Sequence, residues 1–244
     1  MAPTSKQIAD FAAIFDGNPT AYGADTTNGG VRCVRAAAAV GVELHLAYGK
    51  PAGIYPMYKN QVKWGCTDID TGSWEQAHNM YLILQRMELD PWIEISRSKG
   101  FHVWVFANDG WVDAFVMRRA FLFAHHVSNQ LGVWVPPTEV NPKAEWLDDD
   151  QLGNFVRLPY VGGVADSNGR RIMLDPETQV YITLDSFMGR VQGASGATLR
   201  YWADKYKAPK SVYESSEVSS EEAKALAARL IRRGFKIWSE GPPE

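Results

Sequence analysis

The sequence predicts an α+β protein whose centre is a β-α-β-β-α-β unit. Extended apolar segments over about 62–70, 92–96 and 101–107 predict three strands, because each is short and rich in β-branched and aromatic residues. A helical pattern follows the first strand, and a longer one follows the third. This order is typical of ferredoxin-like and RNA-recognition-like sheets, in which the first strand lies between the third and the fourth.

The residues before this unit, 1–60, are expected to form an amino-terminal α/β module. Ile8, Phe11 and Phe15 recur at helical spacing and predict a helix over 5–15, which Gly17 ends. The other expected elements are a loop over 17–30, a helix over 31–40 and strands over 42–48 and 53–58.

Inside the unit, Ser73 and Gln76 have the spacing of a capping box and begin a helix that runs to about Met87. The longer helix is expected over 112–131, with Gly132 as its end. A fourth extended segment begins at 133–135 and leads toward Glu139.

Later elements are shorter. Strands or loops are expected at 153–160, 171–174 and 179–183, and residues 190–218 are expected to be partly irregular. Ser219 and Ser220 precede a last helix, with acidic residues in its first turn and arginines near its end, as the helix dipole favours.

Composition narrows the function classes. The 244 residues are 45% hydrophobic and 22% charged, with a net charge of −3, so tight binding to any DNA sequence by this chain alone is not expected. Cys33 and Cys66 are the only cysteines, which argues against a disulfide framework or a cysteine-rich zinc site. No secretion signal and no membrane-spanning apolar run is recognised, so we expect a cytoplasmic protein with no membrane partner.

Two carboxylates, Asp68 and Asp70, close the first predicted strand of the unit. Residues two apart on a strand project from the same face, and paired carboxylates repel unless a cation lies between them. A divalent ion with oxygen ligands does this best. Asp-x-Asp pairs are often solvated loop acids, but here the pair follows Trp64, Cys66 and Thr67, which favours a metal site.

A second motif, Ser98-Lys99-Gly100-Phe101-His102, follows about thirty residues later. Hydroxyl, ammonium, imidazole and backbone N–H groups in one turn are typical of phosphate binding. His102 could instead be a core histidine, and Lys99 a solvated turn residue. In the expected topology, Asp68 and Asp70 lie next to His102 on one side and the segment with Glu139 on the other, which indicates nucleotide chemistry.

With these motifs, the chain resembles the archaeo-eukaryotic primase superfamily, closest to the primase domains of TOTE conflict systems and of phages and other mobile elements. The resemblance covers about residues 8–175 and includes Asp68-Ile-Asp70, Ser96 to His102, and Gly153 to Pro159. A glutamate, Glu139, is the candidate third acid where this superfamily more often has aspartate.

The resemblance implies a primase-polymerase that makes short primers on single-stranded DNA by two-metal nucleotidyl transfer. Residues 1–218 would form the catalytic domain, with the module 1–60 packed on an RNA-recognition-like core at 61–185, and residues 219–244 a carboxy-terminal helix and tail. Two Mg²⁺ or Mn²⁺ ions, and no zinc, are expected. Their implied ligands, which are also the implied catalytic residues, are Asp68, Asp70 and Glu139. The implied nucleotide-binding residues are Ser98, Lys99, Gly100, His102, Arg157, Arg97 and Arg171.

The expected partners are a single-stranded DNA template, nucleoside triphosphates and a separate replicative helicase, in a bacterial or phage-infected cell. Three alternatives stay open. The chain could be a gap-filling or end-joining polymerase that does not initiate, an inactive module that recruits replication proteins, or a metal-dependent phosphohydrolase. The last class normally uses more His and Asp ligands than this cluster offers.

Overall fold

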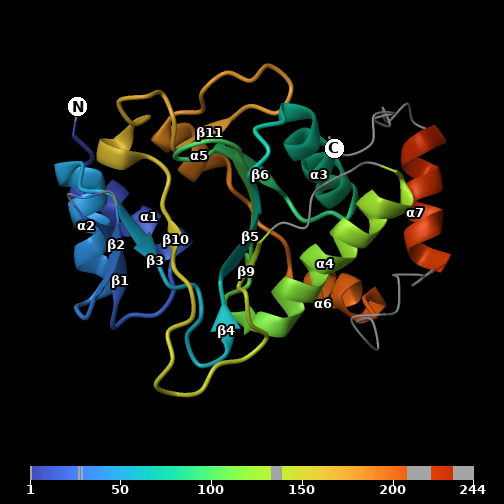
Figure 1. Ribbon diagram of the computed structural model, residues 1–244, viewed down its shortest axis with the longest axis horizontal. Helices are drawn as coiled ribbons and strands as arrows, with labels where there is room; N and C mark the ends of the chain where they lie inside the picture. The colour runs from blue at the N-terminus through green and yellow to red at the C-terminus, as the bar shows by residue number, and fades with distance from the viewer. Residues whose placement is uncertain (1, 27, 29, 133–138, 208–220, 233–244) are drawn as a thin grey trace.

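The centre of the molecule is a five-stranded antiparallel sheet of order β11-β6-β7-β5-β9, which confirms the predicted α+β class (Figure 1). This computed structural model describes residues 2–26, 28, 30–132, 139–207 and 221–232. The predicted first strand, β5, lies between the third, β7, and the fourth, β9. The sheet consists of β5 (Trp64–Ile69), β6 (Trp92–Ile95), β7 (Phe101–Phe106), β9 (Val140–Asn141) and β11 (Ile172–Leu174).

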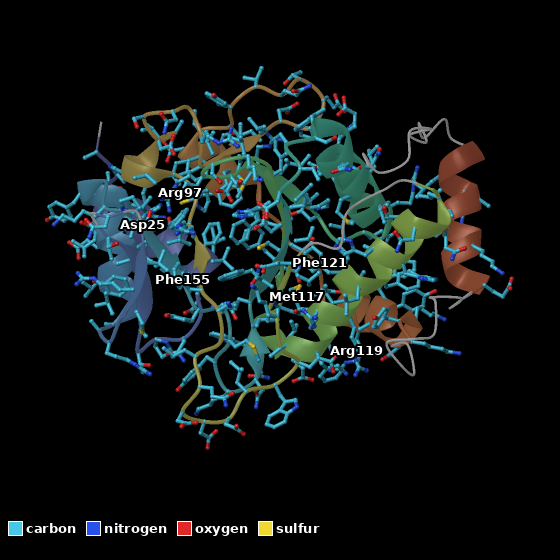
Figure 2. All side chains as sticks on the ribbon, in the orientation of Figure 1. Asp25, Arg97, Met117, Arg119, Phe121 and Phe155 are labelled. Atoms are coloured by element: carbon cyan, nitrogen blue, oxygen red, sulfur yellow. The ribbon has the colours of Figure 1, made fainter. Side chains whose placement is uncertain are left out.

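Two helices, α3 (Trp74–Arg86) and α4 (Ala114–Gln130), cover one face of this sheet. The Ser73 hydroxyl caps α3 by accepting a hydrogen bond from the backbone N–H of Gln76 (3.3 Å). At Gly65 of β5, a Cβ atom would lie 2.6 Å from Met117 Cγ and 3.0 Å from Phe121 Cε2, so α4 packs closely on the strand there (Figure 2).

The predicted helix over 112–131 begins two residues late. Val112–Asp113 form a short strand, β8, that pairs with β4 (Gln61–Val62), so the helix starts at Ala114. The predicted segment 133–135 lies outside the described residues, and the fourth strand, β9, is seen at Val140–Asn141.

The amino-terminal module contributes a second sheet, of order β10-β3-β1-β2. All its pairs are antiparallel. One of its strands comes from residues far along the chain, so the segment 153–160 joins this sheet and not the central one. The elements are α1 (Ser5–Ile14), β1 (Tyr22–Asp25), β2 (Val31–Val34), α2 (Ala38–Tyr48), β3 (Ala52–Ile54) and β10 (Val156–Arg157).

Three predictions for this module are wrong. Residues 17–30 are not only a loop, because Tyr22–Asp25 form β1, which lies between two other strands. Val31–Val34 are a strand, since they pair with β1, and the helix expected over 31–40 begins only at Ala38. The strand expected over 42–48 belongs to that helix, where Val42, His45 and Leu46 are buried at helical spacing.

The module packs on the second face of the central sheet through an aromatic core. Phe15 of the module lies 5.3 Å from Trp104 and 6.2 Å from Trp64, measured between ring centroids, in edge-to-face contacts. Trp64 and Cys66 project from β5 into this core. Asp68 is the next residue along β5 on the same side. The acidic end of β5 therefore faces the amino-terminal module.

The carboxy-terminal part is more helical than expected. Within 190–218, the described residues include α6 (Gly196–Lys205), while the segment 179–183 forms only an isolated bridge, from Tyr181 to Leu174. The last helix is α7 (Glu221–Arg232), and its expected caps lie outside the described residues. The remaining elements are a 3-10 turn at Val161–Gly163 and α5 (Leu184–Arg190). In the part of the chain that the structure describes, no helix is both long and apolar enough to cross a membrane.

Candidate active site

A row of four side chains crosses the central sheet at the end of β5. Antiparallel pairing sets His102 of β7 opposite both Glu94 of β6 and Asp68 of β5. The backbone N–H of Asp68 donates to the carbonyl of Glu139 (2.9 Å), which sets these two residues opposite each other at the start of β9. Because opposite residues project from the same face, Glu94, His102, Asp68 and Glu139 form one row.

Glu94 orients the histidine of this row. Its Oε2 accepts a hydrogen bond from His102 Nδ1 (2.7 Å) and another from Trp104 Nε1 (2.8 Å). His102 Nε2 lies 3.7 Å from Asp68 Oδ1, beyond hydrogen-bonding distance. Burial would lower the pKa of His102, but the carboxylates of Glu94 and Asp68 outweigh it and raise this pKa to about 10. The imidazole is therefore a cation between two acids at neutral pH.

Glu94 is a functional candidate that was not among the predicted site residues. The residue is only 1% exposed and lines the same cavity as the two aspartates. A signal was present in the sequence, since a charged residue in the middle of an apolar strand is unusual unless it has a buried partner.

The oxygen atoms of the row suit a hard cation. Asp68 Oδ1 is buried and has no hydrogen-bond partner, and anionic oxygens are the ligands that Mg²⁺ prefers. Asp70 is exposed just beyond the strand, and Glu139 forms an ion pair with Lys143 (2.5 Å). Among the described residues, no three His, Cys, Asp or Glu side chains are already gathered as a metal site.

The turn between β6 and β7 is held by backbone contacts. The Ser96 N–H donates to the Gly100 carbonyl (3.1 Å), and Arg170 Nε donates to the Ser96 carbonyl (2.6 Å). Gly100 has φ of +88°, and a Cβ there would lie 2.0 Å from the Ile69 carbonyl oxygen. The turn is thus pressed against the end of β5, next to Asp70.

A basic wall, formed by three arginines, lines the same cavity as the acids of this row. Arg97, Arg157 and Arg171 come from three separate segments, and all three pair with one carboxylate, that of Asp25. Figure 2 shows the labelled Asp25 and Arg97 side by side at the amino-terminal module, with Phe155 nearby. No sequence signal indicated Asp25, because it lies in a segment predicted to be a loop.

The four side chains of the row and the three arginines line one cavity of about 350 Å³. Of the sequence-predicted site residues, all except Lys99 and Gly100 line it. The Lys99 side chain is exposed, and Gly100 is buried against β5. The structure adds lining residues that were not among the predicted site residues, namely Glu94, Ser96, Asn141, Lys143, Asn154, Phe155 and Val156. Acids and arginines that line one cavity suit a polyphosphate with bound cations.

Comparison with known families agrees with the resemblance that the motifs indicate. A family model described as the archaeo-eukaryotic primase domain of TOTE conflict systems matches residues 31–201. The chain belongs to this family. As a TOTE-type primase domain, the protein is primase-like or nucleotidyltransferase-like. The matched range contains every sequence-predicted site residue, whereas Asp25 lies before it. A search of curated proteins finds no match.

Proposed function

We propose that this primase domain is a DNA-dependent primase-polymerase that makes short primers on single-stranded DNA by two-metal nucleotidyl transfer. The observation that carries the proposal is the single cavity in which Asp68, Asp70 and Glu139 lie with His102 and three arginines. Its size is in the range of small-molecule sites. Nucleoside triphosphates and a template strand are the proposed substrates, and a separate helicase is a proposed partner.

Asp68, Asp70 and Glu139 would hold two Mg²⁺ or Mn²⁺ ions. Glu139 would have to leave its ion pair with Lys143 in order to bind a metal ion. Bound divalent ions supply Lewis-acid stabilisation of the charge on the attacking and leaving oxygens. Asp68 Oδ1 fits this role, since it is buried, accepts no hydrogen bond and lies 3.7 Å from His102 Nε2, so it can serve as a ligand to a cation.

His102 would donate a hydrogen bond from Nε2 to a phosphate oxygen. Glu94 already holds Nδ1, which fixes the ring so that Nε2 points along the row toward Asp68. The three arginines would bind the other phosphate oxygens by charge-assisted hydrogen bonds. In the reaction, a 3′-hydroxyl attacks the α-phosphorus of the nucleotide, the bond to the β-phosphate oxygen breaks, and pyrophosphate leaves.

The positions of these side chains predict unequal effects of substitutions within the motif Ser98 to His102. His102→Ala should weaken nucleotide binding by about 10-fold or more, since a charge-assisted hydrogen bond contributes about 1.5–3 kcal/mol. Lys99→Ala should weaken it less, because this side chain is exposed and does not line the cavity. Titration calorimetry with a nucleoside triphosphate measures both. Equal binding by His102→Ala and the unchanged protein would make His102 a structural residue only.

The proposed function is tested with unprimed single-stranded DNA, labelled nucleotides and either Mg²⁺ or Mn²⁺. We expect a labelled dinucleotide and short products without primer, and extension when a primer is supplied. Strong extension with no dinucleotide, over a range of templates and with both metals, would favour the gap-filling polymerase. No incorporation under either condition would favour the inactive recruiting module.

A further inference from the structure

One carboxylate, that of Asp25, organises the basic wall of the cavity. Its Oδ1 accepts from Arg157 Nε (2.9 Å), and its Oδ2 accepts from Arg171 Nη2 (3.0 Å). Arg97 Nη1 lies 3.6 Å from the same Oδ2. Asp25 ends β1 of the amino-terminal module, so these pairs also join the module to the site.

The three arginines meet at this carboxylate although they come from different segments. Arg97 lies in the turn after β6, Arg157 in β10, and Arg171 just before β11, so no single element fixes them together. Like charges this close repel, and one carboxylate among three guanidinium groups offsets only part of that repulsion. Burial would raise the pKa of Asp25, but Arg157 and Arg171 outweigh it and hold this pKa below its ordinary value. Asp25 is therefore charged at neutral pH, and it offsets one of the three guanidinium charges.

Arg171 gives a second, independent sign that an anion belongs here. Its side chain is only 4% exposed, and it lines the cavity. Although Nη2 is bonded to Asp25, its Nε and Nη1 atoms have no hydrogen-bond partner. Asp166, the other acid near it, lies 3.9 Å from Nε, too far for a hydrogen bond. Buried guanidinium N–H groups left without an acceptor are costly, and a phosphate oxygen in the cavity would supply one.

We propose that Asp25 is a positioning residue that holds Arg97, Arg157 and Arg171 together as a site for a phosphate group of the substrate. This inference rests on the proposed function for the identity of the substrate. The phosphate belongs either to the nucleotide or to the DNA strand, and both present the same chemistry to the arginines. Asp25 precedes the range that the family model matches, and it comes from β1 of the amino-terminal module.

The proposal predicts that neutralising Asp25 weakens phosphate binding, whereas simple electrostatics predicts that it strengthens this binding. Neutralising Asp25 makes the wall more positive, and a purely electrostatic role would then give tighter phosphate binding. If Asp25 instead positions the arginines, its loss lets them separate, and binding becomes weaker in spite of the added positive charge.

The test measures phosphate binding by titration calorimetry on the full chain, without divalent metal. The probes are inorganic triphosphate and a short single-stranded DNA oligonucleotide with a 5′-phosphate. We expect Asp25→Asn and Asp25→Ala to bind one of the two probes at least about 10-fold more weakly, and the weakened probe identifies the source of the phosphate. Asp25→Glu, which keeps the carboxylate, should recover part of the loss. The matched control is Asp113→Asn, which removes an Asp–Arg pair with Arg200 (2.8 Å) outside the cavity and should bind both probes normally.

Unchanged or tighter binding of both probes by Asp25→Asn would overturn the proposal. If Asp25→Ala does not fold, Asp25→Asn alone decides, and if neither folds, Asp25 is a folding residue and the proposal is wrong.

In the primer-extension assay, we expect Asp25→Asn to raise KM for the weakened substrate more than it lowers kcat. Weaker phosphate binding in a protein that makes no primers would support the role of Asp25 and reject the proposed function. Normal primer synthesis together with unaltered phosphate binding by the Asp25 variants would support the proposed function and reject the role of Asp25.

Discussion

Replacing either Asp68 or Asp70 should reduce nucleotide incorporation by at least about 100-fold, the effect expected when bound ions no longer stabilise several kcal/mol of transition-state charge. Asp68→Asn and Asp70→Asn keep the size of the side chain and remove the charge. The protein should still fold, because Asp68 Oδ1 has no hydrogen bond to lose and Asp70 is exposed. Rates of primer extension and thermal unfolding measure the two effects separately.

The chain offers a matched control for these variants. Asp150 is also an exposed aspartate, but it lies in a loop away from the cavity. Asp150→Asn should therefore extend primers at the normal rate. Near-normal synthesis by Asp70→Asn would show that this residue does not hold a metal ion, and the two-metal assignment would then be wrong.

Gly100→Ala should have the second large effect, on both stability and activity. The added Cβ would lie 2.0 Å from the Ile69 carbonyl oxygen and 3.0 Å from Asp70 Cα, and both neighbours are backbone atoms that cannot rotate away. The turn or the end of β5 must then move. With the positive φ, we expect a loss of about 2–5 kcal/mol in the free energy of unfolding. Because Asp68 and Asp70 lie at this strand end, incorporation should also fall by about 100-fold.

Gly72→Ala separates the two causes of this effect. Gly72 also has positive φ, +75°, but nothing lies within 4 Å of the position where a Cβ would be added. Gly72→Ala should therefore lower the free energy of unfolding by only about 1 kcal/mol, which is the cost of the backbone conformation alone. Urea unfolding followed by tryptophan fluorescence compares the two variants. Equal losses in both would mean that the contact between the turn and β5 is unimportant.

Local patterns were sufficient for the β-α-β-β-α-β unit of the central sheet, but they did not place its fifth strand, β11, beside β6. The capping residues around Ser73, the apolar strands and the two helices between them gave the correct order of elements and put Asp68 next to His102. These signals are local in sequence, and the topology they define allows few arrangements. The sequence therefore predicts that the Asp-x-Asp pair lies beside the histidine.

The amino-terminal module was harder to predict because its strands are short. Val31–Val34 has four residues, too few for an alternation to be distinguished from one helical turn. Only pairing with β1 makes it a strand, and burial of one helical face makes 42–48 part of α2. Tertiary contacts decided both cases, since intrinsic propensities are weak by comparison.

The sequence by itself therefore determined the α+β class, the β-α-β-β-α-β order and the candidate acids with His102. The tertiary structure alone decided which charged side chains pair with one another at the site. Asp25 and Arg171 are separated by 146 residues and yet share a hydrogen bond. Glu94 holds His102 only because the register of β6 on β7 sets them opposite. The physical reason is that ion pairs depend on distance in space, which sequence patterns specify within one element and not between elements that pack from different parts of the chain.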